Sequence, residues 1–123
     1  MILLDTSVWV DHLRRGDATV VRVLESGEAA AHASVIGELA CGNLISRERV
    51  IELLQALPRL AMAIDDEVLY FIERHELMGR GIGYVDAHLL AAAAIGRAPL
   101  WTRDKRLREI ATGLGVAYLE ADQ

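Results

Sequence analysis

Four acidic residues stand at places in the chain where side chains commonly do chemistry. Asp5 and Asp104 each follow a short apolar run, while Glu38 and Asp86 fall near the start of helix-like segments. In open α/β sheets the ligand site lies beyond the carboxyl ends of the strands. The first turns of the helices that follow can face the same crevice. The spacing therefore predicts that the four carboxylates converge on one site.

Carboxylates crowded into one pocket repel each other, and one of them is normally driven toward its neutral form. A bound Mg²⁺ or Mn²⁺ removes that penalty, because hard divalent cations prefer oxygen ligands and keep several waters. Such an ion can activate water and stabilise the oxygens of an in-line phosphoryl displacement. The cluster therefore indicates a divalent-metal site suited to phosphodiester hydrolysis.

Acids near helix starts also have a simpler explanation, because Asp and Glu cap the first amides and complement the helix dipole. Capping alone could explain Asp86 or Asp104, and Asp5 could cap a helix too. Glu38 is harder to explain in this way. With Ser34 as the N-cap, a capping box would need its acid at position 37, which is glycine. From the spacing alone, a metal site and a set of helix caps both remain open.

The elements that must position these acids follow from hydrophobic periodicity. The apolar run at residues 2–4 predicts a strand buried on both faces of a parallel sheet. Further short strands are expected near residues 28–33, 60–64, 100–101 and 116–119. Helices are expected after residues 5 and 34, around 20–24, at 50–57, from 65 toward 78, at 85–95 and at 107–114. Strands that alternate with helices favour an α/β sandwich with a mainly parallel sheet.

The composition fits one domain over residues 1–123. Hydrophobic residues make up 53% of the chain, so we expect some to form a contact surface for a partner or a second copy. The formal net charge of −5 is unlike the basic footprint of most nucleic-acid-binding domains. A local basic rim formed by Arg103, Lys105, Arg106 and Arg108 could still hold phosphates beside Asp104.

The remaining features point to the compartment. Cys41 is the only cysteine, which excludes an intrachain disulfide and favours a reducing environment. The N-terminus lacks the regions of a signal peptide, and the longest apolar segment, residues 87–96, is far shorter than the roughly 20 residues of a membrane span. We therefore expect a soluble, cytoplasmic protein that does not associate with membranes.

Four segments, in this order, resemble the motifs of PIN domains, and specifically of VapC-type toxins from toxin–antitoxin pairs. They are LLDTSVWVDHL, ASVIGELACG, GIGYVDAHLLAAA and LWTRDKRL. The resemblance implies a three-layer α/β/α sandwich with endoribonuclease activity that depends on Mg²⁺ or Mn²⁺. It also implies the toxin of a type II toxin–antitoxin system, which a cognate antitoxin inhibits.

Carried over residue by residue, the resemblance implies that Asp5, Glu38, Asp86 and Asp104 are the catalytic and metal-binding acids, supported by Thr6 and Thr102. The implied partners are RNA, the antitoxin and a second copy of the chain, with a higher toxin–antitoxin assembly also open. Trp9 and Leu13 lie at i and i+4 beside Asp5. They are candidates for the apolar wall of an antitoxin groove, with ordinary core residues as the alternative.

Other residues carry weaker signals. The histidines at positions 12, 32, 75 and 88 show no metal-ligand spacing, and each is expected to be a surface or satisfied residue. Cys41 is expected to be a small core residue. Three other functions remain as alternatives: an aspartyl phosphatase, a receiver-like signalling module, and a binding module whose acids are caps. The phosphatase would need an acid where Ser7 stands, and the receiver would need paired acids at the first strand.

Overall fold

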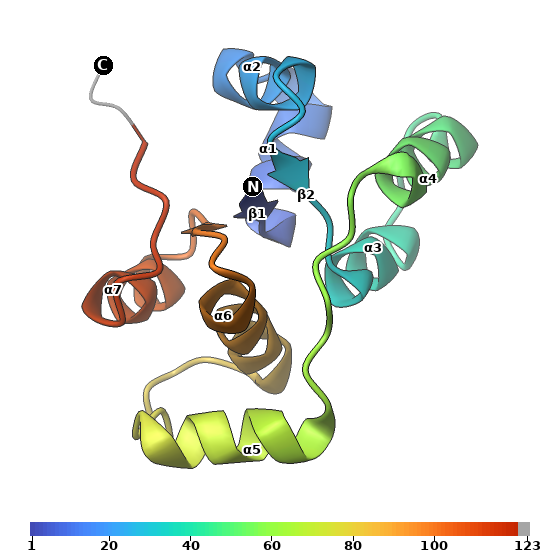
Figure 1. The fold of residues 1–123 in the computed structure, drawn as a ribbon. Coiled ribbons are helices and arrows are strands. Elements are labelled where there is room, and N and C mark those ends of the chain that lie inside the picture. Colours follow the sequence, from blue (N-terminus) through green and yellow to red (C-terminus); the bar gives the residue numbers. More distant parts are fainter. Residues whose placement is uncertain (121–123) are drawn as a thin grey trace.

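Three short parallel strands form the centre of the fold in the computed structural model, which describes residues 1–120 (Figure 1). They are β1 (Ile2–Leu4), β2 (Ala29–Ala30) and β3 (Leu100–Trp101). The central strand is β1, where Leu3 pairs with Ala30 of β2 and with Leu100 of β3. Because both pairings are parallel, the carboxyl ends of all three strands point to the same edge of the sheet.

The central strand is buried on both faces, as its continuous apolar run predicts. Successive side chains alternate between the two faces of a strand, and Leu3 and Leu4 are both fully buried. Helices must therefore cover both sides of the sheet. The predicted α/β/α sandwich with a parallel sheet is confirmed.

Seven helices connect and follow the strands within residues 1–120 (Figure 1). They are α1 (Thr6–Arg15), α2 (Ala18–Glu25), α3 (Ala33–Ala40), α4 (Arg47–Ala56), α5 (Asp65–Arg74), α6 (Tyr84–Gly96) and α7 (Lys105–Gly113). Helix α3 packs against α1 and α4, whereas α6 packs against α5 and β3. Each helix predicted from periodicity is present, although several helices begin or end at residues other than those predicted.

Two of these differences have a clear local cause. The N-cap of α3 is His32 and not Ser34, because the buried His32 Nδ1 accepts the Ser34 backbone N–H at 3.0 Å. Helix α5 ends at Arg74 and does not run on toward residue 78. Two residues later Glu76 has a φ of 52°, a left-handed conformation that cannot continue the helix.

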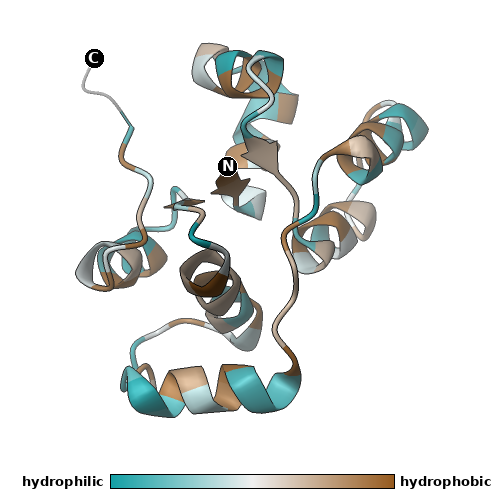
Figure 2. Ribbon diagram, in the orientation of Figure 1, coloured by the Kyte–Doolittle hydropathy of each residue, from teal (hydrophilic) through white to brown (hydrophobic). Residues whose placement is uncertain are grey.

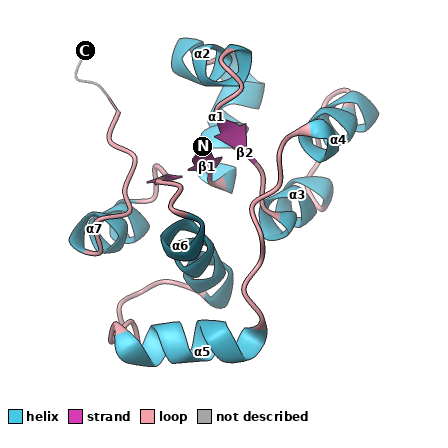
Figure 3. Cartoon of the chain, in the orientation of Figure 1, coloured by secondary structure: helices cyan, strands magenta, loops and turns pink. Residues whose placement is uncertain are grey.

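The strands predicted at residues 60–64 and 116–119 are not formed. Each edge of the sheet is instead extended by one parallel bridge, from Arg59 to Ala31 and from Ala117 to Leu100. Figure 3 draws both segments as loops. A paired strand at these edges would need cover on both faces, and apolar residues in the two segments such as Ile64 and Leu119 are exposed.

The apolar core joins the three strands and α6, which carry hydrophobic colours in Figure 2, with the buried faces of α1, α2, α3 and α7. Helix α6 is buried throughout residues 87–93, as its apolar sequence predicts. Cys41 is exposed, so its predicted place in the core is wrong. It is the C-cap of α3, beyond the last buried residue of that helix, Leu39. In residues 1–120 no helix is both long enough and apolar enough to cross a membrane.

Candidate metal centre

Asp5 is the most tightly held of the four predicted acids. It ends β1 and stands at the N-cap position of α1, with only 7% of the residue exposed. Its Oδ2 accepts two hydroxyl hydrogen bonds, from Ser7 at 2.9 Å and from Thr102 at 2.7 Å. Its side chain makes no capping bond to α1. The cap interpretation therefore does not account for Asp5.

Glu38 lies on α3 and is held by the residue next to Asp5. Thr6 donates its hydroxyl to Glu38 Oε1 at 2.6 Å, across 32 positions of sequence. Glu38 is past the first turn of its helix, so it has no capping role there. The two threonines expected to support the site thus bond two of its acids: Thr6 bonds Glu38, and Thr102 bonds Asp5.

Asp86 and Asp104 do cap helices, as the simpler interpretation held. Asp86 Oδ2 accepts the backbone N–H of Gly83 at 3.2 Å, before the first turn of α6. Asp104 is the N-cap of α7, where its Oδ1 accepts the Leu107 N–H at 3.0 Å. Each cap uses one carboxylate oxygen, so capping does not exclude a second role for the other.

All four acids share one pattern. Each uses one oxygen for internal hydrogen bonds, and the other oxygen accepts no hydrogen bond from residues 1–120. The remaining oxygens are Asp5 Oδ1, Glu38 Oε2, Asp86 Oδ1 and Asp104 Oδ2. The carboxylates are thus fixed on one side and available on the other, which is the arrangement that an oxygen-preferring cation needs.

Asp86 lies close enough to the other three acids to be repelled by each of them. Burial raises the pKa of Asp86 above its ordinary value, and the hydrogen bond from Gly83 partly offsets this. The negative charges of Asp5, Asp104 and Glu38, in that order of size, raise the pKa further. Asp86 therefore feels all three of its predicted partners.

The cluster is not drawn together around one point. Within residues 1–120, no three histidine, cysteine or carboxylate side chains are arranged so that all could ligate one ion directly. Mg²⁺ does not require this, because it usually keeps several waters and binds through one or two carboxylates plus substrate phosphates. Hard oxygen donors in a repulsive group therefore fit a hydrated divalent cation.

Ser7 is a member of the site that the sequence analysis missed. Its hydroxyl donates to Asp5, lies 3.3 Å from the Thr102 hydroxyl, and accepts the Arg103 backbone N–H at 3.0 Å. Ser7 thereby joins the end of β1 to the residues after β3. The available signal was its place two residues after Asp5, in the DTS triplet.

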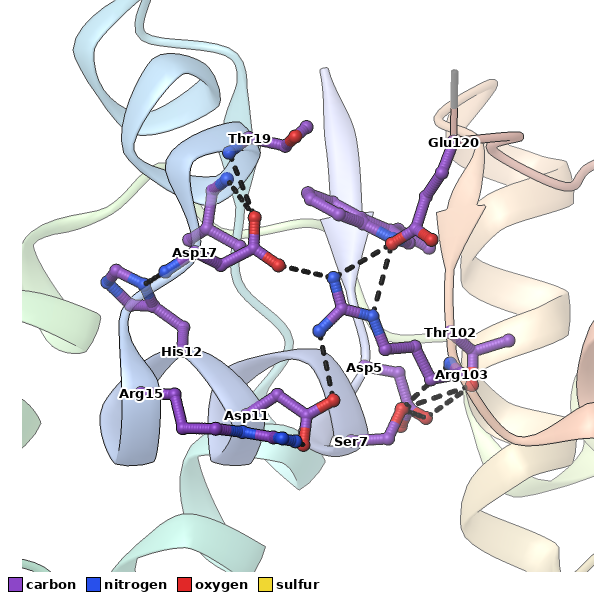
Figure 4. A network of polar contacts seen from close by, with 12 residues as sticks. Asp5, Ser7, Asp11, His12, Arg15, Asp17, Thr19, Thr102, Arg103 and Glu120 are labelled. Atoms are coloured by element: carbon purple, nitrogen blue, oxygen red, sulfur yellow. Dashed lines mark hydrogen bonds and ion pairs between the residues drawn. The ribbon is translucent and has the colours of Figure 1, made fainter. Parts of the chain in front are cut away.

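Arg103 does not belong to a phosphate-binding rim, contrary to the sequence interpretation. Figure 4 shows its guanidinium among three acids: Asp11 and Glu120, each at 2.9 Å, and Asp17. It also lies 5.6 Å from the centre of the Trp101 ring. Burial alone would lower the pKa of Arg103, but the hydrogen bonds that its guanidinium donates to the three acids raise it. The charge of Arg103 is therefore compensated by three acids of the protein itself.

Arg106 occupies a different position in the same basic run. Its side chain packs against Gly81, where φ is +82° and a Cβ would collide with the guanidinium. Gly81 belongs to the loop that leads to Gly83 and Asp86. Arg106 thus connects the start of α7 to the loop before α6. Within residues 1–120, neither Arg106 nor Lys105 nor Arg108 forms an ion pair.

Comparison with known proteins adds to this geometry. The family model for the PIN domain matches residues 2–113. Two curated relatives, both named Ribonuclease VapC32, come from Mycobacterium tuberculosis strains CDC 1551 / Oshkosh and ATCC 25618 / H37Rv. Each is 49% identical to this chain over 121 residues, which cover 98% of both proteins.

Two solved structures share the fold. The structure of FitAB bound to an IR36 DNA fragment matches with a TM-score of 0.65 and 20% identity over 100% of both chains. That of FitAcB from Neisseria gonorrhoeae matches with a TM-score of 0.63 and 22% identity over 95% of both chains. At this level of identity the likeness concerns the arrangement of helices and strands, and it agrees with the sandwich predicted from the sequence.

Proposed function

The chain belongs to the PIN-domain family and, within it, to the VapC ribonucleases, and on this premise we propose that it is the toxin of a type II toxin–antitoxin pair. Its proposed activity is that of a cytoplasmic endoribonuclease dependent on Mg²⁺ or Mn²⁺. One observation carries the proposal. Asp86 is repelled by the three other acids, and no lysine or arginine within residues 1–120 forms an ion pair with any of the four.

The four acids and the hydroxyls that bond them have different roles in this proposal. Asp5 and Asp86 are the principal ligands in this proposal, because Asp5 ends the central strand and its charge acts on Asp86 more strongly than those of Asp104 and Glu38. Glu38 and Asp104 complete the site directly or through water. Ser7 and Thr102 keep Asp5 in one orientation. When bound, the ion supplies the Lewis acidity that activates water and stabilises the phosphoryl oxygens.

The activity is tested with RNA and phosphomonoesters as parallel substrates, with and without EDTA. We expect cleavage of RNA only, its loss in EDTA, and its recovery when Mg²⁺ or Mn²⁺ is added in excess. A phosphatase would release phosphate from the monoesters, and a binding module would act on neither substrate. RNA cleavage that persists in EDTA would falsify the metal-dependent mechanism.

An apolar groove beside the acids supports the antitoxin as partner. A cavity of about 500 Å³ lies between α1, α3 and the loop after α3, and it reaches Thr6 and Glu38. Its apolar lining includes Val10, Leu13 and Ile45. Of the two residues predicted for an antitoxin groove, Leu13 lines this cavity and is 38% exposed, whereas Trp9 is 1% exposed and belongs to the core.

We propose that an apolar segment of the antitoxin occupies this groove and thereby covers Glu38. Leu13→Glu or Ile45→Glu should weaken antitoxin binding at least tenfold, measured by titration calorimetry, because a charge would enter an apolar contact. RNA cleavage by these variants should persist in the presence of antitoxin. Leu53→Glu, at an exposed leucine on α4, is the matched control. If the control variant lost as much antitoxin affinity as the two groove variants, the groove would not be the antitoxin-binding site.

A homodimer is the second partnership that we propose. Exposed apolar side chains gather at the start and along the face of α5, where Ile64 is 64%, Leu69 57% and Tyr70 69% exposed. A surface of this kind commonly marks a contact between proteins. Leu69→Glu should shift the purified protein from dimer to monomer in analytical ultracentrifugation, and an unchanged mass would exclude this face.

A further inference from the structure

One oxygen of Asp5 accepts two hydrogen bonds, and the other accepts none from residues 1–120. Ser7 Oγ donates to Asp5 Oδ2 at 2.9 Å, and Thr102 Oγ1 donates to the same atom at 2.7 Å. The four lone-pair sites of a carboxylate are divided between its two oxygens. Both sites on Oδ2 are therefore occupied by the protein, and only Oδ1 is left for a ligand.

Backbone amides fix the direction of both hydroxyls. Ser7 Oγ accepts the Arg103 N–H at 3.0 Å, and Thr102 Oγ1 accepts the Asp104 N–H at 3.1 Å. The two hydroxyl oxygens also lie 3.3 Å apart, but a hydrogen bond to a charged carboxylate is the stronger one. Each hydroxyl has a single hydrogen to donate. Both hydrogens are therefore directed at Asp5 Oδ2.

Burial makes this arrangement lasting. Asp5 is 7% exposed and Thr102 is 3% exposed, so the hydroxyls have little competition from solvent for Oδ2. The other three acids are held less completely, because the bonded oxygen of each accepts one hydrogen bond and keeps its second lone pair. The restriction to one coordinating oxygen is therefore strongest at Asp5.

The number of oxygens that a carboxylate can offer distinguishes between hard divalent cations. Ca²⁺ takes about 6–8 oxygen ligands in a flexible shell, in which a carboxylate often binds through both oxygens. Mg²⁺ requires a nearly ideal octahedron and keeps several waters, and Mn²⁺ also favours six oxygen ligands. An aspartate that offers one oxygen in a fixed direction suits the octahedral ions and fills the shell of Ca²⁺ poorly.

We propose that Ser7 and Thr102 determine which metal ion the site prefers: by occupying Oδ2 they restrict Asp5 to a single coordinating oxygen and disfavour Ca²⁺ relative to Mg²⁺ and Mn²⁺. Both are positioning residues, since they act through Asp5. The inference rests on the proposed metal centre, with Asp5 as a ligand. Its readout is the ratio of two binding constants, so it is tested without any cleavage reaction.

The test measures the Kd of Mg²⁺ and of Ca²⁺ by titration calorimetry on the wild-type protein and on a Ser7→Ala, Thr102→Val double variant. We expect the wild-type protein to bind Mg²⁺ at least as tightly as Ca²⁺. Groups that orient a metal ligand are commonly worth 10–100-fold in affinity. Without the two hydroxyls Oδ2 is free, so the ratio of the Ca²⁺ Kd to the Mg²⁺ Kd should fall about tenfold. A wild-type preference for Ca²⁺, or an unchanged ratio, would overturn the proposal.

A matched pair at position 102 separates this role from support of the fold. Thr102→Ser keeps the hydroxyl and should keep the wild-type ratio, whereas Thr102→Val keeps the shape and should lower it. General loosening of the site would weaken both ions together and leave the ratio unchanged. Thr112→Val removes a hydroxyl that bonds only the Arg108 carbonyl, so it controls for the loss of a hydroxyl elsewhere. If the double variant does not fold, equal ratios in the two position-102 variants would overturn the proposal.

The proposed function and this inference fail in different ways. If the wild-type protein binds Mg²⁺ and the ratio shifts as expected but no RNA is cut, the nuclease proposal fails and the metal preference stands. If RNA is cut and the ratio is the same in the wild type and the double variant, the nuclease proposal stands and the inference fails. A wild-type protein that binds neither ion would overturn the metal centre and the inference together.

Discussion

Two groups of acids flank residues 102–104, and the protein treats their charge in opposite ways. On one side, Asp11, Asp17 and Glu120 surround the guanidinium of Arg103 (Figure 4). On the other side are the four acids of the candidate metal centre, none of which forms an ion pair with an arginine or lysine of residues 1–120. The pKa of Asp17 is lowered and that of Asp86 is raised.

Under the proposed function, the difference separates acids that stabilise the fold from acids that bind a metal ion. Arg103 shows that this chain can place a cation among carboxylates, at the residue next to Asp104. No arginine or lysine is placed in this way at the candidate metal centre, where hydroxyls of Ser7, Thr6 and Thr102 orient Asp5 and Glu38 without neutralising them. Charge that is oriented but not compensated is typical of a site that takes its cation from solution.

The comparison is tested most strongly by the same substitution on each side. Asp5→Asn keeps the shape of the side chain and removes its charge, so RNA cleavage should fall by about 10²–10³. Asp11→Asn removes one of the partners of Arg103 and should leave cleavage close to that of the wild type. Initial rates on one RNA at saturating Mg²⁺ measure both. Equal losses in the two variants would mean that the two groups do not differ in function.

The response to Mn²⁺ should also differ between the two groups. An ion that binds only the native state stabilises it by roughly 2.7 kcal/mol at a hundredfold excess over Kd. We expect a saturable rise in melting temperature with Mn²⁺ in the wild-type protein and in Asp11→Asn. The rise should be absent in the Asp5→Asn, Asp86→Asn double variant. A rise of the same size in the double variant would show that the ion acts elsewhere.

Removal of Arg103 should destabilise the fold more than it impairs catalysis. Arg103→Met keeps an apolar stem but leaves Asp17 and Glu120 without a cation and Asp11 with Arg15 alone. The free energy of unfolding in urea should therefore fall by about 1 kcal/mol. The deficit should shrink at high salt, which screens the repulsion. Most cleavage should remain, because the backbone N–H at this position still donates to Ser7. Arg108→Met, at an exposed arginine of α7, is the control. An equal loss of unfolding free energy in that variant would show that the ion pairs of Arg103 do not stabilise the fold.

The sequence predicts one of these groups much better than the other. Asp5 and Asp104 can be placed because each follows a strand whose apolar run is visible over a few residues. The partners of Arg103 are 17, 86 and 92 positions away, and nothing local distinguishes Arg103 from Lys105 or Arg106. Pairing over such distances depends on how the first helix and the C-terminal segment meet.

Helix faces show the same limit on a smaller scale. Trp9 and Leu13 are one turn apart on α1, yet Trp9 is buried in the core and Leu13 lines the groove. The i, i+4 spacing predicts a shared face but not where the core ends along it. Periodicity likewise predicts that α3 exists but does not predict its N-cap. That cap is His32 and not Ser34, because the His32 side chain is buried with its Nδ1 against the Ser34 N–H.

The last and smallest effect is the pH dependence of stability, which should have opposite signs on the two sides. Burial would raise the pKa of Asp17, but hydrogen bonds from Arg103 and from the amides of Val20 and Thr19 hold it below the ordinary 3.8. The charge of Asp17 therefore stabilises the fold at neutral pH, and this contribution is lost as pH falls below 3.8 through the folded pKa.

The sign is reversed for Asp86. Its pKa in the folded protein lies above 3.8, so its charge opposes folding at neutral pH, and the penalty disappears as pH falls through the folded pKa toward 3.8. In urea titrations with a chelator present, Asp86→Asn should be more stable than the wild type at pH 7, and Asp17→Asn less stable. Both differences in stability should shrink as pH falls. The difference for Asp86→Asn should disappear at a higher pH than the difference for Asp17→Asn, because the folded pKa of Asp86 lies above 3.8 and that of Asp17 below it. If both variants were destabilised at pH 7, repulsion at the metal centre would be too weak to require an ion, and the contrast between the two groups of acids would fail.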